Sequence, residues 1–67
     1  MDVRERFGQN VRRLRVSLNL SQEELAFRAG VHRTYCSDIE RAIRNPSISV
    51  VQQFADALGV KAGSLLE

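Results

Sequence analysis

Polar and apolar side chains separate onto two faces of one short segment, Val31–Arg41, which reads VHRTYCSDIER. At helical spacing one face is apolar, with Val31, Tyr35, Cys36 and Ile39. The opposite face carries guanidinium, hydroxyl and carboxylate groups, from Arg33, Thr34, Ser37, Asp38 and Arg41. Such groups donate and accept hydrogen bonds. We therefore expect a short helix whose apolar face packs on the protein and whose polar face is free to meet a partner.

Catalytic chemistry is not indicated by the remaining residue types. The chain has one histidine and one cysteine, no glycine-rich phosphate loop and no metal-ligand spacing. A bundle this small also cannot shape a cleft around paired carboxylates. Cys36 is best explained as a small core residue, because no second cysteine and no histidine partner accompanies it. We expect no enzymatic activity, no metal and no cofactor.

Length and cysteine content limit the class of protein. Sixty-seven residues form a single small domain, 1–67, whose core is marginal. The lone cysteine favours a reducing compartment. No apolar run has the length of a membrane span, and no signal peptide is visible. We expect a soluble, cytoplasmic protein without membrane contact.

Charge is distributed unevenly along the chain. Residues 1–45 hold nine arginines against six acidic residues, a net charge of +3, whereas residues 46–67 carry a net charge of −1. A basic first part suits an anionic partner, and a nearly neutral second part suits packing or pairing between chains.

Five helical segments and no strand are predicted. The first runs from about Asp2 to Ser17, with an apolar stripe at Val3, Phe7, Val11, Leu14 and Leu18. The second begins at Ser21, where Ser21 and Glu24 match a capping box and Leu20 and Leu25 match a hydrophobic staple. It ends at Gly30, and the third segment starts again near His32. The short interval matches the turn of a helix-turn-helix.

The second half of the chain is punctuated by Pro46 and Gly59. Pro46 disfavours helix at Asn45, and Ser47 can cap a fourth helix with an apolar face at Ile48, Val51, Phe54, Ala55 and Leu58. Gly59 ends that helix. The last segment, KAGSLLE, is short and is weakened by Gly63.

The pieces LSQEELA, AGV, DIER, RNPS and ALGV, at these intervals, resemble the DNA-binding domain of the lambdoid phage repressor and Cro group, the XRE family. The block HRTYxSxIERxxRN is also similar to controller proteins of restriction–modification systems. The resemblance implies an all-α, lambda-repressor-like bundle of five helices in which the second and third form the helix-turn-helix. It also implies a transcriptional regulator that binds double-stranded DNA, with the third helix in the major groove.

The resemblance assigns two kinds of DNA contact. Base contacts are expected from Arg33, Thr34, Ser37 and Asp38, of which Arg33 can pair with guanine O6 and N7, and Asp38 can accept from cytosine N4 or instead restrain Arg33 or Arg41. Phosphate contacts are expected at the start of the second helix and around the third, from Gln22, His32, Tyr35, Arg41, Arg44 and Asn45.

An ion pair between the ends of the first and third helices is also implied, from Arg15 to Glu40. Two residues depart from the family pattern. His32 stands at the start of the third helix, where a histidine is a poor N-cap. Ala42 stands where the family often has glycine in a left-handed turn, and alanine there costs about 1–2 kcal/mol.

A two-fold symmetric dimer on a pseudo-palindromic operator is expected, because one recognition helix covers too few base pairs for a selective site. The pairing surface is predicted at apolar positions of the second half, Ile48, Val50, Val60, Leu65 and Leu66, although Leu65 and Leu66 could instead close the bundle.

A helix-turn-helix used only for protein–protein interaction is the alternative function. Such a module should expose apolar side chains on its third helix, and this chain places Arg, Thr, Ser and Asp there. The sequence leaves open whether a regulator of this kind is a phage-type repressor, a restriction–modification controller, an antitoxin-type autoregulator or another XRE regulator.

Overall fold

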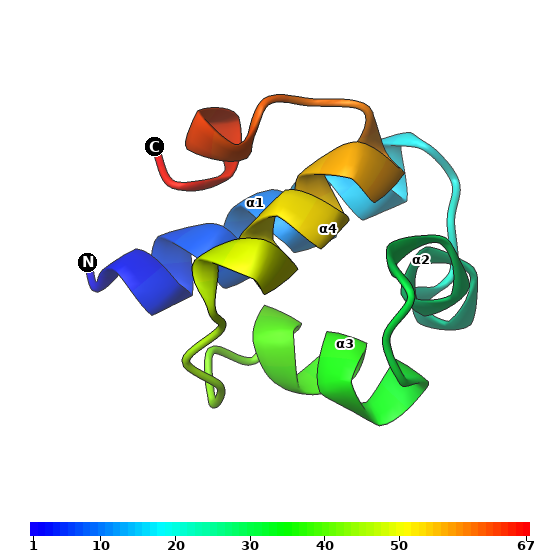
Figure 1. Ribbon diagram of the computed structural model, residues 1–67, viewed down its shortest axis with the longest axis horizontal. Coiled ribbons are helices and arrows are strands. Elements are labelled where there is room, and N and C mark those ends of the chain that lie inside the picture. The colour runs from blue at the N-terminus through cyan, green and yellow to red at the C-terminus, as the bar shows by residue number, and fades with distance from the viewer.

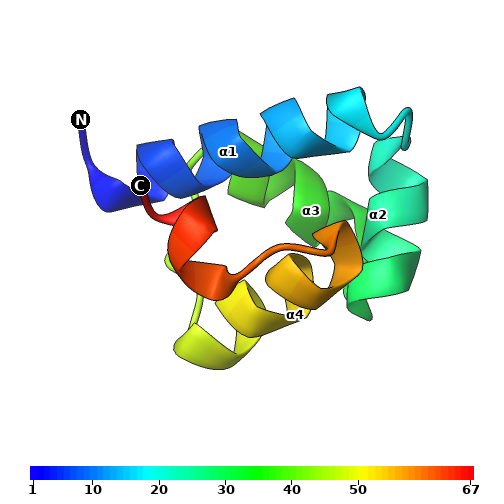
Figure 2. The same ribbon diagram turned by 90° about the horizontal axis from the view of Figure 1, so that it is seen from above.

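Four α-helices and one short 3₁₀ helix make up the fold. The computed structural model describes all residues, 1–67, and places α1 at Val3–Ser17, α2 at Gln22–Ala29, α3 at Arg33–Glu40, α4 at Ile48–Leu58 and η1 at Ala62–Leu65. In Figure 1, α3 lies along one side of the molecule, and η1 and the C-terminus lie on the opposite side. Figure 2 shows α1 and α4 on either side of η1, with both chain ends near one another.

The fifth predicted helix is wrong as an α-helix. The residues Ala62–Leu65 form a single 3₁₀ turn, and Lys61 before them makes no side-chain cap. A four-residue segment that contains Gly63 cannot offset the cost of starting an α-helix. The 3₁₀ turn still closes the core, because it places Leu65 there with no exposed surface.

The core is one cluster to which every helix contributes. Phe7, Leu25, Ile39, Phe54 and Leu65 are its largest side chains, each almost fully buried. Phe7 and Phe54 meet edge to face, with ring centroids 5.9 Å apart. The predicted stripe of α1 is confirmed at Phe7 and Val11 but is wrong at its ends, since Val3 and Leu18 are exposed. Val3 and Leu18 lie at the two ends of α1, beyond the reach of the small core.

Local capping signals set the start of α2 as the sequence predicted. The Ser21 hydroxyl accepts from the Glu24 N–H at 3.0 Å, and a Glu24 carboxylate oxygen accepts from the Ser21 N–H at 2.9 Å. The hydrogen bond that the carboxylate accepts from the Ser21 N–H is the main cause that lowers the pKa of Glu24. Leu20 and Leu25, the two residues predicted to form the staple, are both buried. Gly30 ends the helix at φ 74°, in the left-handed region that the short turn to α3 requires.

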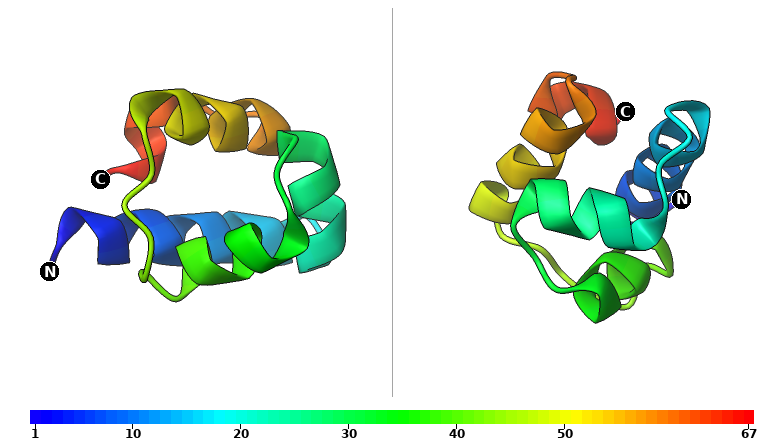
Figure 3. Two further views of the ribbon diagram at one scale, coloured as in Figure 1. Left: turned by 60° about the horizontal axis from the view of Figure 1, so that its bottom comes forward. Right: turned by 90° about the vertical axis from the view of Figure 1, so that its right-hand side faces the viewer.

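The close approach of α1 to α3 depends on a glycine that the sequence analysis did not single out. A Cβ atom on Gly8 would lie 2.5 Å from the carbonyl oxygen of Ile39 and 3.1 Å from that of Glu40. Both neighbours are backbone atoms, so neither can move aside cheaply. Gly8 therefore fixes how near the end of α3 can lie to α1. In the left view of Figure 3, α3 lies over α1, and α2 closes one end of the molecule.

The predicted pair Arg15–Glu40 is present and ties three helices together. Arg15 donates from Nε to one Glu40 oxygen at 2.6 Å and from Nη2 to the other at 3.1 Å. Its Nη1 also donates to the Leu20 carbonyl just before α2, at 2.9 Å. The side chains are 14% and 4% exposed, and the hydrogen bonds to Glu40 raise the pKa of Arg15. The pair thus holds the end of α3 against α1 and the α1–α2 turn.

Removing either partner of this pair should strongly destabilise the fold. Arg15→Ala and Glu40→Ala should each lower the free energy of unfolding by about 3–5 kcal/mol, because each strands a buried charge. The double variant should lose much less than the sum of the two. Thermal or urea unfolding measures all three, with exposed Arg12→Ala as the control. Small, additive losses would show that the two charges act independently.

Candidate nucleic-acid interface

The two faces predicted for α3 are present. Cys36 and Ile39 are buried, and Tyr35 is half-buried, whereas Arg33 and Thr34 are exposed. Four polar residues of α3 line a depression together with Arg41, the C-cap of α3, and one residue from the start of α2. We call this set the α3 face: Gln22, Arg33, Thr34, Ser37, Asp38 and Arg41. No apolar side chain lines it.

A second polar depression continues the α3 face toward α1. It is lined by Arg15, Ser21, Gln22, Glu23 and Arg33. Gln22 and Arg33 belong to both depressions, so together the two form one polar surface over the start of α2 and α3. Glu23 was given no role by the sequence analysis. The N-terminal position of Glu23 on α2, next to Gln22, was the only signal that could have indicated it.

His32 caps α3, which corrects the expectation that histidine serves poorly there. Its Nδ1 accepts from the Thr34 N–H at 3.1 Å, with the backbone in the extended conformation usual for an N-cap. An Nδ1 atom that accepts a hydrogen bond carries no proton, so in the neutral ring the proton is on Nε2. The exposed imidazole thus keeps a donor for a group outside the protein while it satisfies a helix N–H.

Gln22 lies beside the ion pair rather than free in solvent. Its Nε2 donates to a Glu40 oxygen at 3.0 Å, the same oxygen that Arg15 Nη2 contacts. This bond uses one of the two amide N–H donors and leaves the second N–H, which can donate to a phosphate, and the amide oxygen. The side chain expected to meet a phosphate is therefore oriented from within by the Arg15–Glu40 pair.

Asp38 is not a free acceptor on the α3 face. Its side chain is only 13% exposed, and its Oδ2 accepts from Arg44 Nε at 3.1 Å. Its Oδ1 lies 4.0 Å from Arg41 Nη1. Arg44 also stacks over the ring of Tyr35, with its guanidinium carbon 5.2 Å from the ring centroid. Arg33 and Arg41 were the partners of Asp38 expected from the sequence; the partner with the shortest contact is Arg44, which the turn after α3 brings back to Asp38.

That turn contains the strained alanine predicted from the sequence. Ala42 has φ 61°, in the left-handed region. The Ala42 N–H donates to the Ile39 carbonyl, and the Ile43 N–H donates to the Asp38 carbonyl, both at 3.1 Å. This is the hydrogen-bond pattern of a Schellman C-cap. The chain therefore reverses at Ala42 without glycine and returns Arg44 and Asn45, both exposed, to the end of α3.

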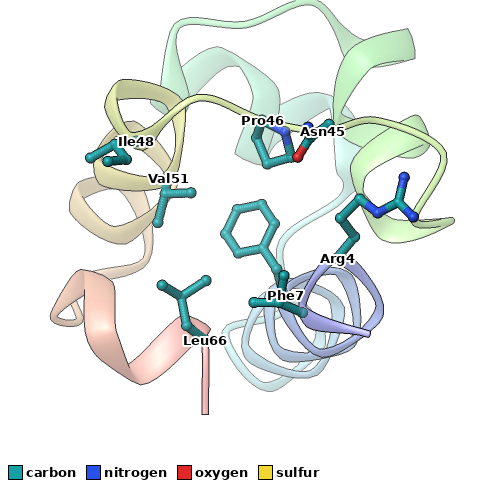
Figure 4. A pocket seen from close by; sticks show the side chains of 8 residues that line it. Arg4, Phe7, Asn45, Pro46, Ile48, Val51 and Leu66 are labelled. Carbon is teal, nitrogen blue, oxygen red and sulfur yellow. The ribbon is translucent and has the colours of Figure 1, made fainter. Parts of the chain in front are cut away.

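The residues predicted for a dimer surface are not equally available. Ile48 is 89% exposed and Leu66 is partly exposed, whereas Val50 and Val60 pack partly against the core. Leu65 has no exposed surface, so it closes the bundle and cannot itself touch a partner. Ile48 and Leu66 border an apolar groove that also includes Val3, Phe7 and Val51. Figure 4 shows Ile48, Val51 and Leu66 around the ring of Phe7, and Arg4, Asn45 and Pro46 also line the groove.

Cys36 lies inside the bundle, and it belongs to no group of side chains that could hold a metal ion. It is fully buried, and burial raises the pKa of its thiol to about 11. The thiolate, which is the reactive and metal-binding form, is thus scarce at neutral pH.

No helix of the structure is long and apolar enough to cross a membrane.

The sequence is similar to a known protein family and to characterised regulators of the same helical arrangement. Residues 11–65 match the family described as Helix-turn-helix. The control protein C.BamHI of Bacillus amyloliquefaciens is 49% identical over 67 residues, which cover 98% of this chain and 83% of the relative.

Two solved structures have nearly the same fold. The restriction–modification controller protein C.AhdI from Aeromonas hydrophila superposes with a TM-score of 0.89 at 40% identity, over 92% of this chain and 94% of that one. The biofilm regulator SinR, solved in complex with DNA, superposes with a TM-score of 0.85 at 37% identity, over 91% and 98% of the two chains. The chain belongs to the helix-turn-helix family, among the XRE-type regulators that include the restriction–modification control proteins.

Proposed function

We propose that this protein is a transcriptional regulator, of controller or repressor type, that binds specific double-stranded DNA through α3. The observation that carries the proposal is the α3 face, which is polar throughout, includes Arg33 and Arg41, and has the exposed Arg44 bonded to its Asp38. A helix of this size fits the major groove of B-DNA. The fold shared with SinR, which was solved on DNA, supports the same use.

Base contacts are assigned to three residues along the exposed side of α3. Arg33 is exposed and takes part in none of the salt bridges of the structure, so its guanidinium is available for guanine O6 and N7. Thr34 beside it offers a hydroxyl or a methyl group to a base edge. Ser37 lies one turn further along the same face and offers a second hydroxyl.

Phosphate contacts are assigned to groups at both ends of the α3 face. The N-terminus of α2 has free N–H groups next to Gln22, where a phosphate is favoured. The neutral His32 ring can donate from Nε2, and Tyr35 lies half-buried at the other side of α3. Arg41, Arg44 and Asn45 follow the end of α3 and are exposed. Such contacts set the position of the protein on DNA without selecting a sequence.

The alternative, a module for protein–protein interaction alone, fits the α3 face poorly. Association surfaces are usually apolar patches with a polar rim. The α3 face has no apolar lining residue, and the apolar groove lies elsewhere, between the start of α1, the start of α4 and the C-terminal residues. We assign DNA to the first surface and a second copy of the chain to the second.

A two-fold dimer is the assembly that we propose. Two α3 helices about 34 Å apart would contact successive major grooves and require a pseudo-palindromic operator. The pairing surface is centred on Ile48 and Leu66, which are exposed at the apolar groove, with Val50 and Val60 as partly buried neighbours. Leu65 supports this surface from inside the core.

Selection of binding sites from random duplex DNA tests the function and the role of Arg33 together. The wild-type protein should enrich a pseudo-palindrome with one guanine in each half that depends on Arg33. Arg33→Ala should weaken binding by about 1–3 kcal/mol and relax preference at that base pair alone. Equal weakening on all sequences would instead make Arg33 a phosphate contact.

The salt dependence of binding should identify the phosphate contacts. Arg41→Ala or Arg44→Ala should each flatten the slope of log affinity against log salt by about one unit, because fewer counterions are released. Lys61→Ala is the matched control. Lys61 precedes η1, which Figure 1 draws on the side opposite α3, so its removal should leave the slope nearly unchanged. An unchanged slope for both arginine variants would remove them from the interface.

The double variant Ile48→Asp/Leu66→Asp should convert a dimer into a monomer and weaken operator binding at the same time. Charged side chains at the apolar groove would have to be desolvated on pairing. Sedimentation at micromolar concentration measures the assembly. Phe27→Asp is the control, because Phe27 on α2 is 88% exposed, nearly the same as Ile48, but lies away from the groove. A strictly monomeric wild-type protein with full affinity for a single, non-palindromic site would contradict the dimer.

A further inference from the structure

Asp38 is an acidic residue on a surface that we assign to polyanionic DNA. A free carboxylate there would repel phosphates, and a carboxylate that contacts cytosine N4 would have to be open to solvent. Asp38 is neither free nor open. Its side chain is 13% exposed, Oδ2 accepts from Arg44 Nε at 3.1 Å, and Oδ1 has Arg41 Nη1 at 4.0 Å.

Asp38 makes two contacts with the segment that follows α3. Its backbone carbonyl accepts from the Ile43 N–H at 3.1 Å, across the left-handed turn at Ala42. Its carboxylate then binds the side chain of the next residue, Arg44. Backbone and side chain of one aspartate therefore close the same turn, which lacks the glycine that would relieve its strain.

Arg44 is oriented by two contacts that leave most of its donors free. Its Nε is used by Asp38, and its guanidinium lies over the ring of Tyr35 at 5.2 Å from the centroid. Neither Nη atom has a hydrogen-bond partner in the protein, and the side chain is 50% exposed. The arginine is thus held in place while both terminal nitrogens remain available for a phosphate.

We propose that Asp38 is a positioning residue for DNA binding, which orients Arg44 against Tyr35 before DNA arrives and makes no base contact itself. The inference rests on the proposed function, since it names how one phosphate contact of that function is prepared. An arginine that is already oriented loses less side-chain freedom on binding. Arg44 and Arg41 balance the negative charge of Asp38. The electrostatic repulsion between this carboxylate and the DNA phosphates is therefore reduced.

The first experiment needs no DNA. In the free protein, NMR should show slower solvent exchange of the Arg44 Nε–H than of the Nε–H of Arg12, an exposed arginine of α1. Asp38→Ala should abolish this difference, whereas Asp56→Ala, which removes an exposed aspartate of α4, should leave it intact. Equal exchange of Arg44 and Arg12 in the wild type would overturn the inference.

The second experiment is a double-variant cycle on the selected operator. Asp38→Ala should weaken binding about three- to tenfold when Arg44 is present, and should cause no loss, or a small gain, in the Arg44→Ala background. The bases preferred by Asp38→Ala should be those of the wild type. Thermal unfolding of each variant separates these effects from loss of the fold.

Two results of the cycle would overturn the inference. One is an equal effect of Asp38→Ala in both Arg44 backgrounds, which would show that the two residues act separately. The other is a changed preference at one base pair, which would make Asp38 a base contact. If the wild-type protein selects no duplex at all, the proposed function fails, and the exchange measurement alone then decides whether Asp38 orients Arg44.

Discussion

The bidentate pair between Arg15 and Glu40 is the interaction on which the placement of the α3 face depends. Glu40 is the last residue of α3, and Arg15 lies near the end of α1, so the pair fixes the position of the end of α3 relative to α1. Arg15 also donates to the Leu20 carbonyl, and Gln22 donates to Glu40. The Glu40 carboxylate and the Arg15 guanidinium therefore fix the positions of α1, α2 and α3 relative to one another. A buried pair of this kind contributes more to a single arrangement of helices than to net stability.

The end of α3 is fixed from two sides by backbone constraints. On the side of α1, Gly8 allows the carbonyls of Ile39 and Glu40 to approach more closely than any Cβ would permit. On the other side, the Schellman turn at Ala42 reverses the chain within one residue. The helix between these constraints has only eight residues, so its polar face has little freedom to rotate or slide. A rigid helix suits a surface whose side chains must meet fixed positions on DNA.

The molecule keeps its polar and apolar surfaces apart. The α3 face and the depression next to it are lined by polar residues only, and the groove beside Phe7 is lined mainly by apolar ones. Within the polar surface, two of the three acids are bonded inside the protein: Glu40 to Arg15 and Gln22, and Asp38 to Arg44. Glu23 is exposed and takes part in no salt bridge. The arginines that remain exposed can act on an anionic partner, because internal partners occupy the carboxylates of Glu40 and Asp38.

The sequence by itself determined what is local. Ser21 with Glu24, Gly30, Ser47 and Gly59 set the helix limits, because a cap acts within one turn, and the spacing of apolar residues separated the two faces of α3. The family resemblance supplied the Arg15–Glu40 pair, which the structure confirms. Only the tertiary structure decided which apolar residues the small core could cover: Leu65 is enclosed, whereas Ile48 and Val3 are not. It also decided that Asp38 binds Arg44 and that Gly8 is needed, because both depend on chain segments that meet only after α3 packs on α1 and the chain reverses at Ala42.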